Sequence, residues 1–307
     1  MLRSSQNANH SLSPLENPRF PAGGFVKVNA YAKINLFLDV AGKRADGYHD
    51  IVSVMQSVDL CDDLMIEALP GESGVQLFCN DPQLPTDETN LIVKAANALI
   101  REFDIPCGFK IKLNKRIPLG AGLAGGSSDC AATLHGINKL CNLNIPFTRL
   151  LEIGKSLGAD VPFCLTNGTA LTEGIGEKIT LLPTHPPCFI VIVCPGVHVS
   201  TGEIFSRLVS FSTACVNPML NAISKKNLQQ LSTLFYNIFT PITTEIHPEI
   251  FDLIAELKTL SALGAEMTGT GSSVFAYFNN EQSALKAFHI MKLKNKVFLC
   301  KVVDNKW

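Results

Sequence analysis

The segment from Pro118 to Asp129, which reads PLGAGLAGGSSD, constrains this chain more than any other stretch. Glycine tolerates backbone conformations with positive φ, and without a Cβ it lets main-chain N–H groups approach a bulky anion. We expect Ser127 and Ser128 to cap a helix that begins near Asp129, and the N-terminal end of a helix attracts phosphate. The segment therefore predicts a loop that cradles a phosphate group. The predicted phosphate-binding residues are Pro118, Leu119, Gly120, Ala121, Gly122, Leu123, Ala124, Gly125, Gly126, Ser127 and Ser128.

The loop alone does not identify which ligand carries the phosphate, because its G-x-G-x-x-G spacing occurs in unrelated folds. A dinucleotide-binding unit needs an acidic residue about 20 positions later, where this chain has Cys141 and Asn142. A P-loop ends in Gly-Lys-Ser/Thr, and a protein kinase carries Val-Ala-Ile-Lys and His-Arg-Asp signatures. This loop ends differently, and the sequence contains neither kinase signature. For the loop taken alone, a glycine-rich connection that binds nothing also stays open.

The chain of 307 residues is long enough for two domains, each with its own core. Its hydrophobic content of 46% and its charged content of 17% are typical of a soluble globular protein. The net charge is −1, and no block dense in lysine or arginine is present. The composition gives no electrostatic attraction to nucleic acid or to anionic membranes, so we expect neither as a partner.

Ten cysteines are scattered along the chain, with no C-x-x-C pair and no cysteine–histidine cluster at the spacing of a zinc site. Most of them, including Cys164, Cys188 and Cys194, lie in apolar surroundings. We expect buried free thiols in a reducing compartment, and the pattern identifies no metal ligands. The longest strongly apolar run, 188–194, is far too short to span a bilayer. A cytoplasmic protein is therefore expected.

The chain divides into a tail and two halves. Residues 1–24 are rich in Ser, Asn and Pro and lack apolar periodicity, which predicts a disordered tail. The proline-rich stretch 183–187 favours a domain boundary. The resulting N-terminal domain spans 25–185 and holds the glycine-rich loop, and the C-terminal domain spans 186–307.

Apolar periodicity predicts strands and helices in both domains. We expect a first helix capped by Thr89, another after the loop, and a third from Thr148 to near Gly158; Asp160 then precedes an apolar strand. In the C-terminal domain, helices are expected over 202–209, 228–239, 248–260 and 281–293. Strands are expected over 189–194 and 297–303, and two further short strands flank a turn within 265–275. This alternation indicates a ferredoxin-like domain. In the N-terminal domain the expected strands are 25–41, 51–60, 64–69, 75–79, 109–113, 168–173 and 177–182.

Three segments follow one another in order: AKINL at 32–36 with DGYH at 46–49, the loop, and MTGTGSSVF at 267–275. In this order they resemble the three motifs of the GHMP kinases, small-molecule kinases named for galacto-, homoserine, mevalonate and phosphomevalonate kinases. The resemblance covers 26–303. It implies an α+β fold of two domains, the first like ribosomal protein S5 domain 2 and the second a ferredoxin-like GHMP domain, with the active site between them.

The elements DGYH and LGADVPF (157–163) resemble the branch of this family that uses ATP, with Mg²⁺, to phosphorylate the 2-hydroxyl of 4-diphosphocytidyl-2-C-methyl-D-erythritol. Two alternatives stay open. Another GHMP kinase would share the loop but lack DGYH, and a catalytically inactive nucleotide-binding relative would be expected to have lost Lys33 or Asp160, both of which are present. One departure is Tyr31, where relatives usually carry proline, and it bears on local strand pairing rather than on Lys33.

A lysine inside an apolar strand is costly to bury unless it is paired, and a nearby carboxylate would supply the partner. From the residues alone, a structural ion pair and a catalytic pair explain Lys33 and Asp160 equally well. The resemblance implies that Asp160 is the catalytic base and that Lys33 lies with it in the site.

The resemblance also implies substrate contacts for Asn35, Tyr48 and His49. An aromatic face would stack on the cytosine, and polar groups would contact its edge. Phe205 is a further candidate for stacking from the second domain, although an ordinary apolar helix position explains it nearly as well.

Overall fold

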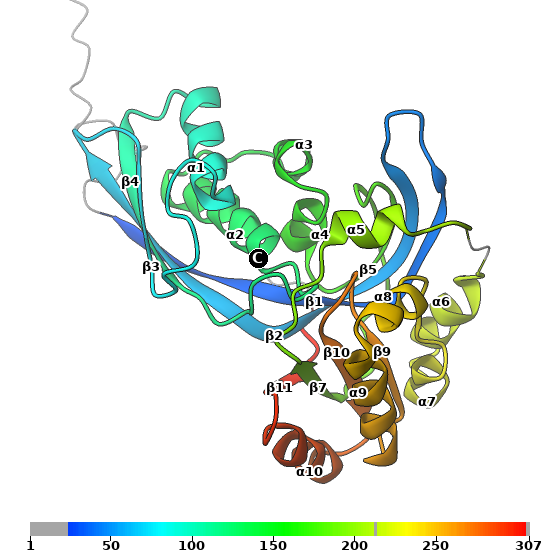
Figure 1. Cartoon of the computed structure of the whole chain (residues 1–307). Helices are drawn as coiled ribbons and strands as arrows, with labels where there is room; N and C mark the ends of the chain where they lie inside the picture. Colours follow the sequence, from blue (N-terminus) through cyan, green and yellow to red (C-terminus); the bar gives the residue numbers. More distant parts are fainter. Residues whose placement is uncertain (1–23, 212–213, 305–307) are drawn as a thin grey trace, which may run out of the picture.

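The computed structural model describes residues 24–211 and 214–304. The predicted disordered tail lies outside the described residues, apart from Gly24, whose carbonyl accepts a hydrogen bond from Ala68 N at 3.0 Å. The described chain forms two β-sheets with helices packed on them (Figure 1). The predicted α+β fold class is therefore confirmed. Within these two ranges, no helix combines the length and apolarity needed to cross a membrane.

The larger sheet has seven strands and is built around one long antiparallel pair. This pair is β1 (Phe25–Lys43) and β2 (His49–Pro70), and its hairpin projects beyond the rest of the sheet (Figure 1). The strand order is β3-β4-β2-β1-β8, with β5 also paired to β2 and β6 paired to β5. The other strands are β3 (Val75–Cys79), β4 (Cys107–Asn114), β5 (Thr169–Gly174), β6 (Lys178–Leu181) and β8 (Tyr236–Asn237).

The centre of β1 is buried without interruption from Ala32 to Val40, because it is covered on both faces. Three register shifts between β1 and β2 bend the pair. One of them explains a wrong prediction: 51–60 and 64–69 are not separate strands. Tyr31 pairs with Cys61 and Ala32 with Val58, so the two residues between Val58 and Cys61 form a bulge while β2 continues through it.

Helices α1 (Leu91–Glu102), α2 (Gly125–Leu140), α3 (Phe147–Leu157) and α4 (Val161–Thr166) cover one face of the larger sheet (Figure 1). The predicted cap of the first helix is wrong, because Asn90 is the N-cap and its side chain accepts a hydrogen bond from Ile92 N at 2.8 Å. The expected strand after Asp160 is also wrong. Pro162 lies in the first turn of α4, where proline favours a helix.

The smaller sheet contains β7 (Phe189–Cys194), β9 (Gly264–Met267), β10 (Val274–Phe278) and β11 (Lys296–Lys301). Its order is β11-β7-β10-β9, and neighbouring strands are antiparallel. Helix α9 (Pro248–Thr259) precedes β9, and α10 (Glu281–Met291) precedes β11. This order and connectivity confirm the ferredoxin-like arrangement.

The side chains of β7 alternate between two cores, as a strand buried on both faces requires. Ile190 and Ile192 face the larger sheet and join a cluster with Ile34 and Leu36 of β1. Val191 and Val193 face the opposite side and join the cluster beneath α9 and α10. The two halves therefore share a continuous apolar contact, while the boundary between residues 185 and 186 stays a prediction.

The segment between β7 and α9 crosses back to the larger sheet. The predicted helix over 228–239 is wrong beyond Ser232, because Tyr236 and Asn237 form β8 and pair in parallel with Phe37 and Leu38 of β1. Tertiary pairing decides this segment over its local helical pattern. The helices here are α5 (Thr201–Ser206), α6 (Asn217–Ser224), α7 (Leu228–Ser232) and α8 (Thr240–Ile246).

The ten cysteines are free, as expected from their scattered spacing. Eight are buried, whereas Cys79 is partly buried and Cys215 is exposed. Burial raises the pKa of the Cys188 thiol to about 12, and this thiol is therefore unreactive at neutral pH.

His185 is buried in the segment that connects the two halves of the chain, and its ring makes two polar contacts. Its Nδ1 lies 2.6 Å from Pro186 O, and its Nε2 lies 3.2 Å from the hydroxyl of Tyr277 on β10. A carbonyl only accepts, so Nδ1 carries the proton and Nε2 accepts from Tyr277 in the neutral ring. Burial lowers the pKa of His185 to about 4, against a weaker opposing effect of the hydrogen bond to Pro186.

This burial predicts a pH dependence of stability. Between pH 6.5 and about 4 the unfolded chain protonates His185 and the folded protein does not, so the free energy of unfolding falls as pH falls. Relative to His185→Gln, the wild type should lose up to about 3 kcal/mol between pH 7 and pH 4 in urea titrations. The exposed His289→Gln variant should keep the wild-type slope. Equal slopes for wild type and His185→Gln would contradict the prediction.

Candidate active site

The glycine-rich loop leads into α2, which begins at Gly125. The helix starts earlier than predicted, and the N-cap residue is Ala124 in the left-handed conformation with φ 56°, with no side-chain cap. Ser127 and Ser128 therefore do not cap the helix. The Ser128 hydroxyl instead donates to Tyr31 O at 2.6 Å, which ties the first turn of α2 to β1.

Gly122 is the position in the loop where only glycine fits. Its φ is +74°, and a Cβ there would overlap Thr268 O and lie 2.9 Å from Gly271 O. The loop thus packs backbone to backbone on the turn that joins β9 to β10. Gly120 has φ +63° but a more open environment, where a Cβ would meet only the ring of His198, with Nδ1 at 3.4 Å. The glycine requirement anticipated from the sequence therefore has a specific cause at Gly122.

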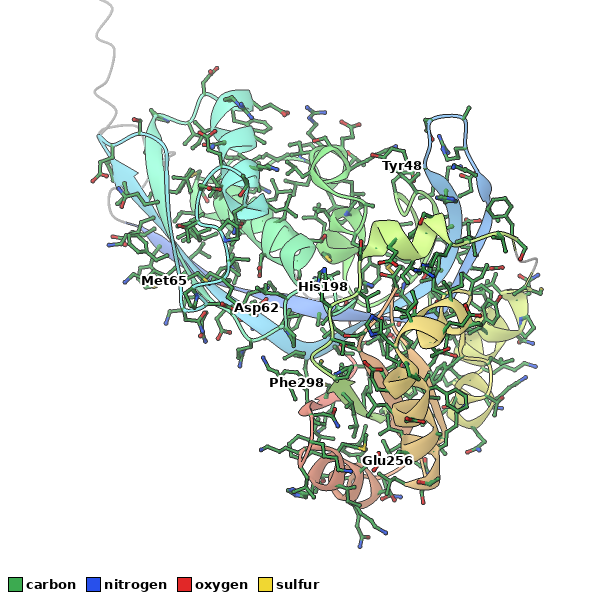
Figure 2. All side chains as sticks on the ribbon, in the orientation of Figure 1. Tyr48, Asp62, Met65, His198, Glu256 and Phe298 are labelled. Atoms are coloured by element: carbon green, nitrogen blue, oxygen red, sulfur yellow. The ribbon has the colours of Figure 1, made fainter. Side chains whose placement is uncertain are left out.

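A buried charge cluster lies beneath the loop, and the sequence pattern did not predict it. Lys115 Nζ is 2.5 Å from Asp62 Oδ2 and 2.8 Å from Asp129 Oδ2. Asp62, labelled on β2 in Figure 2, also accepts from the backbone N–H of Ile117 at 2.8 Å. Asp129 lies in the first turns of α2 and forms an ion pair with Lys115. The cluster anchors the chain that enters the loop.

The pKa values of this cluster follow from burial and from one cation shared by two carboxylates. Burial has the largest single effect on the pKa of Lys115 and would lower it, but the contributions of Asp129 and Asp62 together outweigh burial and raise this pKa. Burial is the main cause that raises the pKa of Asp129 to about 7; the Lys115 ammonium opposes this, and the nearby Asp62 carboxylate adds to it. Lys115 therefore stays charged, and its role is to hold the loop.

Lys33 and Asn35 lie side by side in the buried centre of β1. Lys33 Nζ donates to Asn35 Oδ1 at 2.7 Å and to Gly122 O at 2.9 Å. Asn35 Oδ1 also accepts from Gly269 N at 3.0 Å, and Asn35 Nδ2 donates to Ser53 Oγ at 2.9 Å. Among the described residues Lys33 has no carboxylate within ion-pair distance, so the expected direct pair with Asp160 is absent. An ammonium group has three N–H donors. Two of them are used by Asn35 and Gly122, and the third is left to donate to a ligand in the cavity.

Asp160 is the N-cap residue of α4, and its side chain makes no capping hydrogen bond. It lines the same cavity as Lys33. Both charges act on the nearby thiol of Cys164: burial raises its pKa well above the usual value, Asp160 adds to the rise, and Lys33 opposes it. The structure thus brings the two predicted catalytic side chains to one site without joining them.

Aromatic rings form the other end of the site. His49 at the start of β2 and Phe205 of α5 have ring centroids 5.0 Å apart, and Phe205 packs on Phe239 at 4.6 Å. Phe211 approaches His49 at 6.3 Å. Tyr48 is 60% exposed at the tip of the β1–β2 hairpin (Figure 2). Phe211 and Phe239 were missed, because their sequence context is that of ordinary apolar positions.

Two cavities meet at the loop. The larger, about 710 Å³, reaches from Lys33 and Asp160 to the aromatic rings, and also contains Asn35 and Lys43. The smaller, about 240 Å³, is lined by the loop from Pro118 to Ser127 together with Leu91 and Lys115. Gly122, Ala124 and Ser127 line both. Of the predicted phosphate-binding residues, only Ser128 lines neither, because its hydroxyl is used by β1. The geometry suits two ligands that meet at Ser127.

The part of the chain that the structure describes has no group of three or more His, Cys, Asp or Glu side chains that could hold a metal ion. A magnesium ion does not need such a group, because it usually binds one or two protein oxygens and completes its shell with phosphate oxygens and water. Ser127 lines both cavities and carries a hydroxyl oxygen, so it fits that kind of site.

The packing of the loop predicts different effects for two alanine substitutions. Gly120→Ala should lower the free energy of unfolding by about 1–2 kcal/mol, the cost of a side chain in the left-handed region. Gly122→Ala carries the same cost and also overlaps Thr268 O, so it should lose at least about 2 kcal/mol more. Urea denaturation of both variants measures the difference. Equal losses would show that the loop moves away from the β9–β10 turn without penalty.

Comparisons with known proteins agree with this geometry. A family model described as GHMP kinases N terminal domain matches residues 90–168, and one described as GHMP kinases C terminal matches residues 219–296. The 4-diphosphocytidyl-2-C-methyl-D-erythritol kinase of Lachnoclostridium phytofermentans is 42% identical over 287 residues, covering 92% of this chain and 98% of that protein. The enzyme of the same name from Acetivibrio thermocellus is 43% identical over 283 residues, covering 91% and 98%.

Solved structures lead to the same family. A crystal structure of 4-(cytidine 5'-diphospho)-2C-methyl-D-erythritol kinase has a TM-score of 0.74 and 29% identity, covering 90% of this chain and 99% of the other. Homoserine kinase from Cytophaga hutchinsonii also has a TM-score of 0.74, at 20% identity and with 92% and 95% covered, which supports the fold alone. With both family models matched and relatives above 40% identity over most of its length, this chain belongs to the GHMP kinase family.

Proposed function

We propose that this protein transfers the γ-phosphoryl group of ATP to the 2-hydroxyl of 4-diphosphocytidyl-2-C-methyl-D-erythritol, giving the 2-phosphate and ADP in non-mevalonate isoprenoid precursor biosynthesis. Its relatives of 42–43% identity carry the name of that kinase. The observation that carries the proposal is the larger cavity, which has Lys33 and Asp160 at one end and Tyr48, His49 and Phe205 at the other. A substrate with a nucleobase and a distant hydroxyl matches both ends.

The smaller cavity is the proposed site of the ATP triphosphate. Backbone N–H groups of the loop and the N-terminal end of α2 favour an anion there, and the overlap of the cavities at Gly122 and Ser127 brings the γ-phosphate to the hydroxyl. A bound Mg²⁺ would neutralise charge on the phosphates, and Ser127 would contribute a hydroxyl to it. Proximity of the two ligands is itself a large part of the rate enhancement.

Asp160 is the proposed general base. Its carboxylate makes no capping hydrogen bond and faces the cavity. It accepts the proton of the 2-hydroxyl as that oxygen bonds to the γ-phosphorus and the bond to ADP breaks. Lys33 keeps its third N–H donor for the transferring group, where charge accumulates, while Asn35 and Gly122 O fix its position. Proton transfer and charge stabilisation are thus divided between two side chains.

The aromatic end is proposed to bind the cytosine. The rings of His49 and Phe205 pack on each other with centroids 5.0 Å apart and present one aromatic surface, and Tyr48 on the hairpin supplies a further face that is exposed to solvent. Stacking between aromatic faces and a base contributes about 1–3 kcal/mol. Phe205 comes from the second half of the chain, so base binding also draws the halves together.

A substrate panel tests the proposed activity. Coupled assays should detect ADP with 4-diphosphocytidyl-2-C-methyl-D-erythritol, and far less with mevalonate, homoserine or galactose at the same concentration. A clear preference for one of the other three compounds would overturn the assignment and favour another member of the family. Absence of turnover with all four, together with retained ATP binding, would favour an inactive relative.

Variants of Asp160 and Lys33 test the chemistry. Asp160→Asn should lower kcat by roughly 10²–10⁴, the range of a general acid–base group, with little change in ATP affinity. Lys33→Met should also lower kcat, because a cation is lost where negative charge accumulates. If the two act as one unit, the double variant should be little worse than the worse single one.

The matched control is Asp252→Asn, at an exposed position on α9, which should keep wild-type kcat. Near-normal kcat of Asp160→Asn together with a lower melting temperature would favour a purely structural carboxylate, and the base would have to be sought elsewhere.

A further inference from the structure

The proposed substrate carries negative charge on both phosphates of its diphosphate, and the residues assigned so far leave that charge unmatched. Three charged side chains, Lys33, Lys43 and Asp160, line the larger cavity within the described chain. Lys33 is held at the transfer end by Asn35 and Gly122 O. Asp160 has the same sign of charge as the diphosphate. Lys43 is therefore the cation that remains for the middle of the substrate.

The position of Lys43 follows from strand register. It is the last residue of β1 and pairs directly with His49 of β2. Directly opposed residues place their side chains on the same face of the sheet, with Cβ atoms about 4.5–5.5 Å apart. The ring of His49 packs on Phe205 in the aromatic end of the cavity. The flexible stem of Lys43 thus starts beside the base site and can bring its ammonium group to the phosphates attached to the nucleoside.

The carboxylates near Lys43 pair with its neighbour Arg44, so no carboxylate of the described chain neutralises the charge of Lys43. Arg44 pairs with Asp46 at 3.1 Å and with Asp50 at 3.2 Å, which uses the carboxylates of the hairpin. Lys43 has no ion pair with any described residue, and its side chain is exposed at the cavity. An exposed lysine side chain has a flexible stem and reorients readily, as a ligand for phosphate requires.

We propose that Lys43 binds the diphosphate of the substrate and so selects a nucleoside diphosphate ester over an uncharged nucleoside. The inference rests on the proposed function, because it assumes that the base stacks on the aromatic surface that His49 and Phe205 form. It assigns Lys43 to substrate affinity and not to the chemical step, since Lys33 and Asp160 occupy the other end of the cavity.

Binding of cytidine and of CDP, measured by titration calorimetry, tests the assignment on the full chain. Lys43→Gln should raise the Kd of CDP by roughly 3- to 30-fold, the range of a partly exposed charge-assisted hydrogen bond, and should change the Kd of cytidine less than about 2-fold. Lys43→Arg should retain most of the affinity for CDP, and Lys43→Glu should lose more than Lys43→Gln. In turnover assays the KM of the substrate should rise by the same factor, with kcat and the KM of ATP unchanged.

Arg44→Gln is the matched control, since it removes a neighbouring cation that does not line the cavity. It should leave the ratio of the CDP and cytidine affinities at the wild-type value, and a selective loss for CDP here would refute a specific role for Lys43. An equal loss of cytidine and CDP affinity in Lys43→Gln would also refute it, because the side chain would then shape the base site. If the wild type binds neither compound, the proposed function is wrong and the assignment of Lys43 that rests on it is overturned as well, whereas a failure confined to the Lys43 variants overturns that assignment alone.

Discussion

The side-chain amide of Asn35 is the contact on which the arrangement of the site depends. Its Oδ1 accepts from Lys33 Nζ, from Thr268 Oγ1 and from Gly269 N, and its Nδ2 donates to Ser53 Oγ. One residue therefore joins β1, β2 and the β9–β10 turn, and through Lys33 it also joins the glycine-rich loop. All of these groups are buried or partly buried, so removing the amide would leave donors without acceptors, at about 1–3 kcal/mol each. The relative position of the two halves at the site is fixed by this hydrogen-bond junction as well as by apolar packing.

Two lysines near the loop are neutralised in different ways, and this difference separates support from chemistry. Lys115 is shared by Asp62 and Asp129 beneath the loop, where its charge is fully used. Lys33 is held by an amide and a carbonyl, which are neutral acceptors, so its charge remains directed at the cavity. A buried ion pair to Asp160 would have cancelled both charges in the place where a phosphoryl group must be transferred. Keeping them apart leaves one cation and one base for the ligands.

Much of the fold and of the candidate site is predictable from the sequence, and the errors share a physical cause. The alternation of strands and helices predicts the ferredoxin-like sheet. The motifs single out Lys33, Asp160 and the aromatic residues Tyr48, His49 and Phe205, and in the structure all five line one cavity. The caps at Thr89 and at Ser127 were wrong because capping depends on the local path of the backbone. The helix expected through 239 ends early because β8 pairs with β1, a contact far away in sequence that overrides local propensity.

What the sequence alone determined is the set of chemical groups and the local conformations they permit: a glycine-rich loop before a helix, a lysine in an apolar strand, and an acid before a proline. These are properties of neighbouring residues, and short-range sterics and periodicity specify them. Only the tertiary structure decided which groups meet. The partners of Lys33, the charge cluster at Lys115 and the cation at Lys43 beside His49 depend on strand register and on the contact between two sheets, which join residues that are distant along the chain.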